Sequence, residues 1–425
     1  MTNQSQNIIQ ILNHNGRILF LTRFIRLFSY GFLSVILVLY LIEIRLSETQ
    51  FGLLLTLTLL GDTLISLWLT TSADRLGRKK MLIAGSLLMF LAGFIFSFNT
   101  NFLILTIAAV IGVISPSGKE VGPFLAIEQA ALSQIVPGTN RTHIFGWYNL
   151  VGSLATALGS LAGGLISQGL HNSGMSFLNS YRVLIIAYGT SGLILIAFFL
   201  RLTKEIETNN EKKVSSKSLK SLLGIHHSTN IIMKLSALFS IDAFAGGFII
   251  QSIMAYWFYK KFNLEPAALG SIFFFANILA AVSALTASRI AKKIGLINTM
   301  FFTHLPSNIL LILIPFSPNL EIAITLLLIR FSISQMDVPT RQSYTMAVVN
   351  PDERSAAAGI TGVARTTGAA FSPVIAGSLM SNPFLFNMPF ILAGGIKIIY
   401  DFLLYFSFRR LQPPEEIIIN KEKEI

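Results

Sequence analysis

Long apolar stretches recur along almost the whole chain, and short polar segments separate them. Most are roughly 20 residues long, the length that an α-helix needs to cross a hydrocarbon core of about 30 Å. The fourth and tenth run on to Val136 and Val349, so we expect their cytoplasmic ends to extend beyond the bilayer. The pattern predicts twelve spans, at residues 18–42, 51–73, 81–98, 102–128, 143–168, 181–202, 231–258, 267–291, 297–316, 319–345, 355–381 and 388–408.

One long polar segment divides this pattern in two. Residues 203–230 read TKEIETNNEKKVSSKSLKSLLGIHHSTN, a composition typical of a linker. Within it, SLKSLLGI has two interpretations: a short amphipathic helix on the inner leaflet, or part of a solvated tether. The segment separates a predicted six-helix bundle at 1–202 from a second at 231–408, and residues 409–425 follow as a tail. We expect an all-α membrane protein of two six-helix bundles.

The two predicted bundles look like copies of one another. With a shift of 213 residues, Glu128-Gln129 falls on Arg341-Gln342, and the loop 136–146 falls on 349–359. Several matches at a single offset are hard to obtain by chance in helices rich in Leu, Ile and Ala. Parallel repeats of this kind place a solute site near the middle of the membrane, between the repeats.

The positions of Lys and Arg predict the orientation. If the N-terminus lies in the cytoplasm, the segments on that side hold 20 basic residues and those on the other side hold 4. Basic residues accumulate in cytoplasmic loops, so we expect both termini to be cytoplasmic, in a chain that crosses the cell (inner) membrane many times.

Composition agrees with this fold class. Hydrophobic residues make up 53% of the chain and charged residues 12%, about half the charged fraction of a soluble protein. The net charge of +12 follows from the basic cytoplasmic loops, so no nucleic-acid partner is needed. The chain has no cysteine, its six histidines lack metal-ligand spacing, and Ser117–Glu120 lacks the flanking residues of a phosphate-binding loop. We expect no metal, cofactor or nucleotide, an ion gradient of protons as the energy source, and a monomer in the lipid bilayer.

The loop between the second and third predicted helices contains a basic motif, Asp74-Arg75-Leu76-Gly77-Arg78-Lys79-Lys80. It resembles the signature G-x-x-x-D-R-x-G-R-[KR]-[KR] of the major facilitator superfamily (MFS), and the twelve spans and central linker extend the resemblance over the whole chain. The motif is common among drug and metabolite proton antiporters of that family. The alternative is a solvated topology signal, but that leaves a carboxylate inside a basic run unexplained.

The resemblance implies that this loop is an inner gate between the two bundles. Asp74 would face the start of the eleventh helix, where unpaired N–H groups favour an anion, and Gly77 would allow the tight turn. Arg78 would reach a polar partner at the inner end of the fourth helix. Two positions depart from the family pattern: Thr70 replaces a glycine, and Gln134 replaces an aspartate. The gate residues implied by the resemblance are Asp74, Arg75, Gly77, Arg78, Gln134 and Arg354.

Charged residues inside apolar helices are costly and need an explanation. By the resemblance, helices 1, 4, 7 and 10 line the central cavity. Most of the buried charges lie on these helices, and the candidate substrate and proton residues are Arg23, Arg26, Glu128, Asp242, Arg330, Asp337 and Arg341.

Depth along the helices singles out two of these residues. Asp242 and Arg330 each lie about 16 Å from the start of their predicted span, which predicts a pair at the membrane centre with Asp242 as proton carrier. The competing interpretation is static pairing at i,i+4, for Asp337 with Arg341 and for Lys397 with Asp401; we favour it for the second pair. Asp62 remains open between packing and proton handling.

Together these features predict a secondary active transporter that exports a small organic molecule by alternating access coupled to protons. The first alternative is uptake or exchange of an organic anion bound by Arg23, Arg26 and Arg330. The second is a receptor or scaffold on the same fold, against which the gate loop argues. Catalytic residues are not expected, because the sequence shows no nucleophile–base or metal constellation.

Overall fold

The computed structural model describes residues 12–137, 140–207 and 227–411, and the regular structure in these ranges is helical throughout. The helices are α2 (His14–Glu43), α3 (Glu48–Leu76), α4 (Arg78–Phe98), α5 (Phe102–Ile111), α6 (Phe124–Ile135), α7 (Arg141–Asn172), α8 (Phe177–Phe199), α10 (Thr229–Gly247), α11 (Gln251–Phe262), α12 (Pro266–Ile294), α13 (Leu296–Leu313), α14 (Leu320–Ser334), α15 (Asp337–Val348), α16 (Arg354–Ala370), α17 (Ser372–Met380) and α18 (Met388–Phe408). Short 3-10 turns occupy Lys204–Ile206 and Ile314–Phe316.

The predicted all-α membrane fold is confirmed. Ten helical stretches of the described residues are long and apolar enough to cross a membrane. The predicted fourth and eleventh spans consist of shorter helices, α5 with α6 and α16 with α17. Residues 208–226 of the predicted linker, which include the SLKSLLGI stretch, and residues 412–425 of the predicted tail lie outside the described residues.

The fourth span is not the single helix that its apolar length predicts. The structure ends α5 at Ile111 and begins α6 at Phe124, with irregular backbone between them. Gly118 and Gly122 have φ of 69° and 77°, a conformation that a right-handed helix excludes, and Pro123 precedes α6. Gly118 and Gly122, four residues apart, therefore do not form one face of a continuous helix. A hydropathy pattern gives the length and the apolarity of a segment, and neither property reveals a break in the helix.

Three other predicted spans are also interrupted. The seventh stops after Gly246-Gly247 and resumes at Gln251, and the tenth is broken at residues 335–336. The eleventh is interrupted at Phe371, just before Pro373 in the first turn of α17. Proline lacks the N–H that would continue the helix, and glycine weakens a helix interior.

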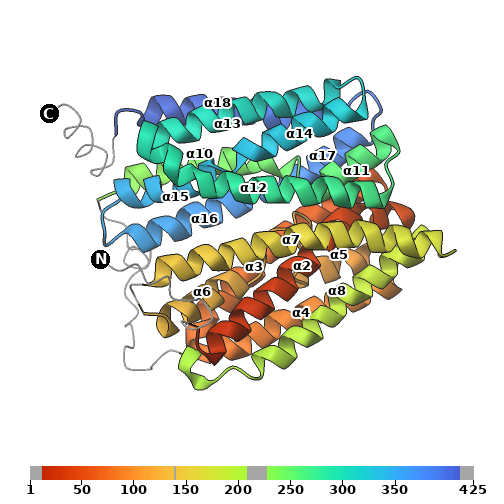
Figure 1. The fold of residues 1–425 in the computed structure, drawn as a ribbon, viewed down its shortest axis with the longest axis horizontal. Helices are drawn as coiled ribbons and strands as arrows, with labels where there is room; N and C mark the ends of the chain where they lie inside the picture. Colours follow the sequence, from red (N-terminus) through yellow and green to blue (C-terminus); the bar gives the residue numbers. More distant parts are fainter. Residues whose placement is uncertain (1–11, 138–139, 208–226, 412–425) are drawn as a thin grey trace, which may run out of the picture. The chain divides into compact units, whose positions relative to one another are not determined.

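The described chain divides into two compact units. Unit 1 contains residues 1–212 and 250–274, and unit 2 contains residues 213–249 and 275–425. Unit 1 thus includes α11 and the first part of α12 in addition to α2 to α8 (Figure 1).

Close helix contact defines the core of unit 1. Helix α2 packs along α7 and α8, and α4 packs along α8. A Cβ atom at Gly159 would lie only 2.0 Å from the carbonyl oxygen of Phe28, so only glycine lets α2 and α7 approach this closely. Ala155, Gly159 and Gly163 are spaced four residues apart, and this pattern of small residues on one face of a helix allows such a close contact.

Unit 2 is organised around two helix pairs, α10 with α16 and α13 with α18. Their shared core is apolar and aromatic, and includes Phe239, Met300, Tyr344 and Tyr400.

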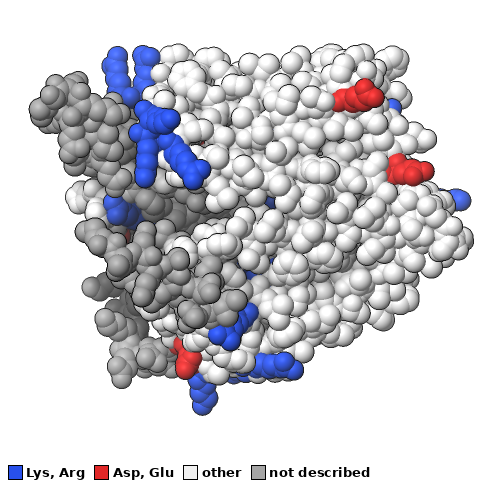
Figure 2. Space-filling view, in the orientation of Figure 1, with Lys and Arg blue, Asp and Glu red and all other residues white. Residues whose placement is uncertain are grey.

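Large apolar side chains also cover the outside of the protein. Leu64, Trp68 and Phe98 are 68%, 60% and 64% exposed. On the face shown in Figure 2, Lys and Arg gather at one end, beside a broad surface almost without charged residues. Such a surface is favourable against lipid and unfavourable in water.

Candidate functional site

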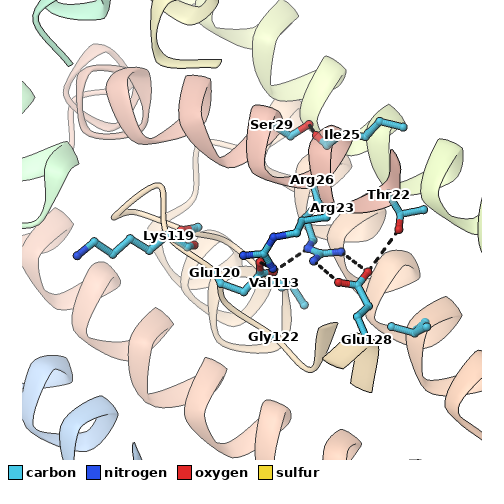
Figure 3. A network of polar contacts seen from close by, with 12 residues as sticks. Thr22, Arg23, Ile25, Arg26, Ser29, Val113, Lys119, Glu120, Gly122 and Glu128 are labelled. Atoms are coloured by element: carbon cyan, nitrogen blue, oxygen red, sulfur yellow. Dashed lines mark hydrogen bonds and ion pairs between the residues drawn. The ribbon is translucent and has the colours of Figure 1, made fainter. Parts of the chain in front are cut away.

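Helix α2 and the broken fourth span form a buried charge network in unit 1. Arg26 donates from Nη1 and Nη2 to the two carboxylate oxygens of Glu128, at 2.9 and 2.7 Å, and from Nε to Glu120 at 2.7 Å. Arg23 donates to the other oxygen of Glu120 at 2.9 Å. Tyr148 donates its hydroxyl to Glu128, and Figure 3 shows the arginines and carboxylates turned toward one another.

This network neutralises its own charges. Arg26 and Glu128 are completely buried, and buried charges are tolerated only when they are paired and hydrogen-bonded. Arg23 and Arg26, expected to be available for an organic anion, instead form ion pairs with Glu120 and Glu128. Sequence reasoning singled out Arg23, Arg26 and Glu128 as candidates, but neither Glu120 nor the pairing of these residues with one another.

The irregular segment 112–123 positions Glu120 in this network. Asp62 anchors the segment, because its Oδ1 accepts hydrogen bonds from the backbone N–H of Gly122 at 2.6 Å and from Ser66 at 3.1 Å. Non-helical backbone at membrane depth needs such internal partners. Of the two roles considered for Asp62, the geometry accounts for the packing role directly.

The gate loop has a defined structure within unit 1. Gly77 adopts φ of 103°, as expected for the tight turn. Arg78 donates to Asp74 at 3.2 Å and to Gln134 at 2.8 Å, so the expected partner at the inner end of the fourth span is confirmed. Arg75 and Arg354 are exposed. The expected contact of Asp74 with the eleventh helix joins the two units and stays a prediction.

Sequence reasoning missed a second partner of the gate loop, the start of the predicted linker. The carboxylate of Glu207 accepts hydrogen bonds from the backbone N–H groups of Arg78 and Lys79, at 2.7 and 3.2 Å, and thereby caps the N-terminus of α4. Gln134 donates to the backbone carbonyls of Glu205 and Glu207, both at 2.8 Å. The beginning of the linker is therefore tied to the motif.

A second buried network lies in unit 2, centred on Asp242 of α10. Its carboxylate accepts hydrogen bonds from Lys397 of α18 and, at 3.1 Å, from Arg341 of α15. Arg341 also forms an ion pair with Asp337 at 2.9 Å, which is the i,i+4 contact of the competing, static interpretation. His304 of α13 places Nε2 3.8 Å from Asp242.

His304 links Asp242 to a second carboxylate. Its Nδ1 lies 2.6 Å from Asp401 Oδ1, and Asn308 donates to the other oxygen of Asp401 at 2.8 Å. His304, Asp242 and Asp401 are 5%, 4% and 1% exposed. The unit thus holds an imidazole between two buried carboxylates at membrane depth.

Two pairs expected from the sequence are wrong. Asp242 does not form an ion pair with Arg330 among the described residues, because Lys397 and Arg341 occupy its carboxylate. Lys397 does not pair with Asp401, because each turns to a neighbouring helix, Lys397 to α10 and Asp401 to α13. Depth along a helix predicts the level of a side chain in the membrane but leaves its direction around the axis open.

Lys397, Asp401 and His304 were missed as site residues because they lie on the ninth and twelfth spans, which the resemblance does not assign to the cavity. The sequence nevertheless contains a signal that points to these residues. Each span carries ionisable or amide side chains four residues apart in an apolar helix, His304 with Asn308 and Lys397 with Asp401.

Comparisons with known proteins identify the family. A sequence profile described as Major Facilitator Superfamily matches residues 19–337. The Saccharomyces cerevisiae protein named uncharacterized membrane protein YJR124C is 30% identical over 419 residues, which cover 92% of this chain and 93% of that protein. This chain belongs to the Major Facilitator Superfamily. As a member of this superfamily, it is a multi-pass membrane transporter and not an enzyme.

Other MFS proteins resemble the chain more distantly. Quinolone resistance protein NorA of Staphylococcus aureus is 22% identical over 381 residues, with 87% of this chain and 90% of NorA covered. A mutant of the nucleoside transporter NupG superposes with a TM-score of 0.75 at 14% identity, over 93% of this chain and all of that one. A D-xylose-proton symporter gives a TM-score of 0.70 at 14% identity, over 92% and 97% of the two chains. The two structural likenesses show the MFS fold.

Proposed function

We propose that this MFS protein is a secondary transporter that couples proton movement to the transport of a small organic solute. The observation that carries the proposal is His304, buried at membrane depth between Asp401 and Asp242. Histidine is the side chain whose charge normally changes near neutral pH, and intramembrane ionisable residues mark proton and solute pathways.

The surrounding contacts give a physical route from protonation to movement. Asp242 is held by cations from two other helices, Lys397 of α18 and Arg341 of α15. A proton on Asp242 removes the charge that holds both cations, so these helices lose their attraction to α10. Such a local change of charge can shift a protein between two packed arrangements.

Two directions of transport have support. The name of NorA refers to quinolone resistance, which favours efflux of a small organic compound in exchange for protons. Uptake or exchange of an organic anion is the second candidate, and Arg330 and Arg365 of unit 2 favour it, because neither forms an ion pair with any described residue.

The proton-coupling proposal is tested with the wild-type protein in proteoliposomes. Ligands are first found by a thermal-shift screen of the purified protein, and transport of the best ligand is then followed under an imposed pH gradient. We expect accumulation that a protonophore abolishes. Accumulation toward the alkaline side indicates symport, and accumulation toward the acidic side indicates antiport. Proton coupling would be refuted if the ligand equilibrated across the membrane independently of the pH gradient. It would also be refuted if the ligand bound stably without being transported, and that outcome would favour a receptor.

We further propose that both termini and the linker lie in the cytoplasm of a cell whose plasma membrane holds the protein. The chain lacks cysteine, so single cysteines introduced by Ser215→Cys and Ser381→Cys report topology without background. On intact cells we expect a membrane-impermeant maleimide to label the Ser381→Cys variant and to label the Ser215→Cys variant only after permeabilisation. Labelling of the Ser215→Cys variant from outside would overturn the orientation.

A further inference from the structure

Two arginines in the membrane-spanning part of unit 2 take no part in the ion pairs around Asp242. Arg330 of α14 is 6% exposed, makes no hydrogen bond or ion pair with any described residue, and has a buried Nε without a partner. Its guanidinium carbon lies 5.1 Å from the centre of the Phe331 ring. Arg365 of α16 is half-buried, and its Nε is likewise buried and unpartnered among the described residues.

Both arginines belong to the same electrostatic cluster and lie at a similar level of their helices. Arg330 and Arg365 each interact electrostatically with Asp242. Counted from Leu320 and Arg354, where their helices begin, Arg330 and Arg365 lie about 15 and about 16 Å along the axis. A membrane-spanning helix has its midpoint near this depth.

The cluster contains more positive than negative charge. Its cations are Arg330, Arg341, Arg365 and Lys397, and its carboxylates are Asp242, Asp337 and Asp401. Even with every carboxylate ionised and His304 neutral, cations are in excess among the described residues of the cluster. The carboxylates already make their short contacts with Lys397, Arg341 and His304, so the described part of the chain offers neither Arg330 nor Arg365 a counterion at ion-pair distance.

A guanidinium group that lies at membrane depth without a counterion destabilises the protein, unless a bound ligand supplies the opposite charge. Its planar set of donors matches the oxygens of a carboxylate or phosphate, to which it binds in a bidentate manner. We propose that Arg330 and Arg365 bind the carboxylate or phosphate group of an anionic organic solute, and that this solute is what the protein transports. This inference rests on the transport function proposed above and supplies its substrate class.

The first experiment measures ligand binding to purified protein in detergent, without a pH gradient. The probes are benzoate, succinate and glycerol phosphate. The first two are compared with the neutral amides benzamide and succinamide, which have a similar shape, and the third with glycerol, which lacks the phosphate. We expect at least one anion to raise the Tm by several degrees while its neutral counterpart has no effect. We expect the Kd of that anion to weaken at least tenfold in Arg330→Gln and in Arg365→Gln, and to be unchanged in Arg289→Gln, which alters an exposed arginine of α12.

The second experiment needs no ligand and separates a binding role from a structural one. Without solute, Arg330→Gln and Arg365→Gln are expected to keep or raise the Tm, because each removes an uncompensated charge. Arg341→Gln is expected to lower it, because Asp242 and Asp337 lose their shared partner. A fall of the Tm in Arg330→Gln and Arg365→Gln equal to that in Arg341→Gln would make these arginines structural and overturn the proposal.

The binding proposal is also overturned if no anion shifts the Tm, or if neutral counterparts bind equally well. These outcomes are independent of proton coupling, since no gradient is imposed. Anion binding without pH-driven transport would instead refute the coupling proposal and leave the substrate class in place.

Discussion

Replacing Glu128 with alanine is expected to destabilise the protein by about 3–5 kcal/mol, the usual cost of removing one partner of a buried ion pair. Glu128 is fully buried and accepts two hydrogen bonds from Arg26 and one from Tyr148. Without it, Arg26 keeps only Glu120 as a counterion and remains completely buried. The measurement is thermal or denaturant unfolding of the purified protein in detergent.

The matched control for this variant is Glu43→Ala, which removes an exposed glutamate at the end of the same helix that carries Arg26. We expect little change there, because exposed charges contribute little to stability. Equal stability of the Glu128→Ala and Glu43→Ala variants would mean that water or lipid headgroups compensate Arg26, and that the network is not a structural centre of unit 1.

Replacing Asp242 with asparagine is expected to abolish solute accumulation driven by a pH gradient while solute exchange across the membrane continues. The amide cannot take up a proton, and it no longer offers a charge to Lys397 and Arg341. Both activities are measured in proteoliposomes, with the ligand found in the thermal-shift screen. Asp242→Glu, which retains a titratable group, is expected to restore part of the gradient-driven accumulation.

The exchange assay keeps this prediction falsifiable if the variant folds poorly, because exchange requires a folded carrier. Wild-type accumulation and pH dependence in Asp242→Asn would exclude Asp242 as the proton carrier. Attention would then turn first to His304 and Asp401 beside it, and then to Glu128, Asp337 and Asp62, the other buried or half-buried acids considered from the sequence.

Features that depend on one segment of chain could be predicted from the sequence. Apolar length located the spans, and the motif predicted the turn at Gly77. The pair Asp337–Arg341 followed from helical spacing alone. In each case the interacting groups are close in sequence, or the property belongs to a single helix.

Features that depend on which helices are neighbours, and on the direction of each side chain, could not be predicted in this way. Asp242 and Arg330 have matching depth, but Lys397 and Arg341 reach the carboxylate from α18 and α15. The break in the fourth span escaped detection because residues 112–123 are still largely apolar or small, while Gly118 and Gly122 adopt backbone angles that hydropathy does not describe.

The excess of cations around Asp242 also has an electrical consequence. In the antiport mode, where no proton travels with the solute, a carrier that binds a monovalent anion at Arg330 and Arg365 carries at least one charge less when loaded than when empty of solute. Membrane voltage acts on net charge that moves through the field, with about 2.3 kcal/mol per elementary charge per 100 mV. The voltage would therefore act more strongly on the return of the empty carrier than on the loaded step. An interior-negative potential would hold the empty site toward the cytoplasm, and depolarisation would speed its return to the outside.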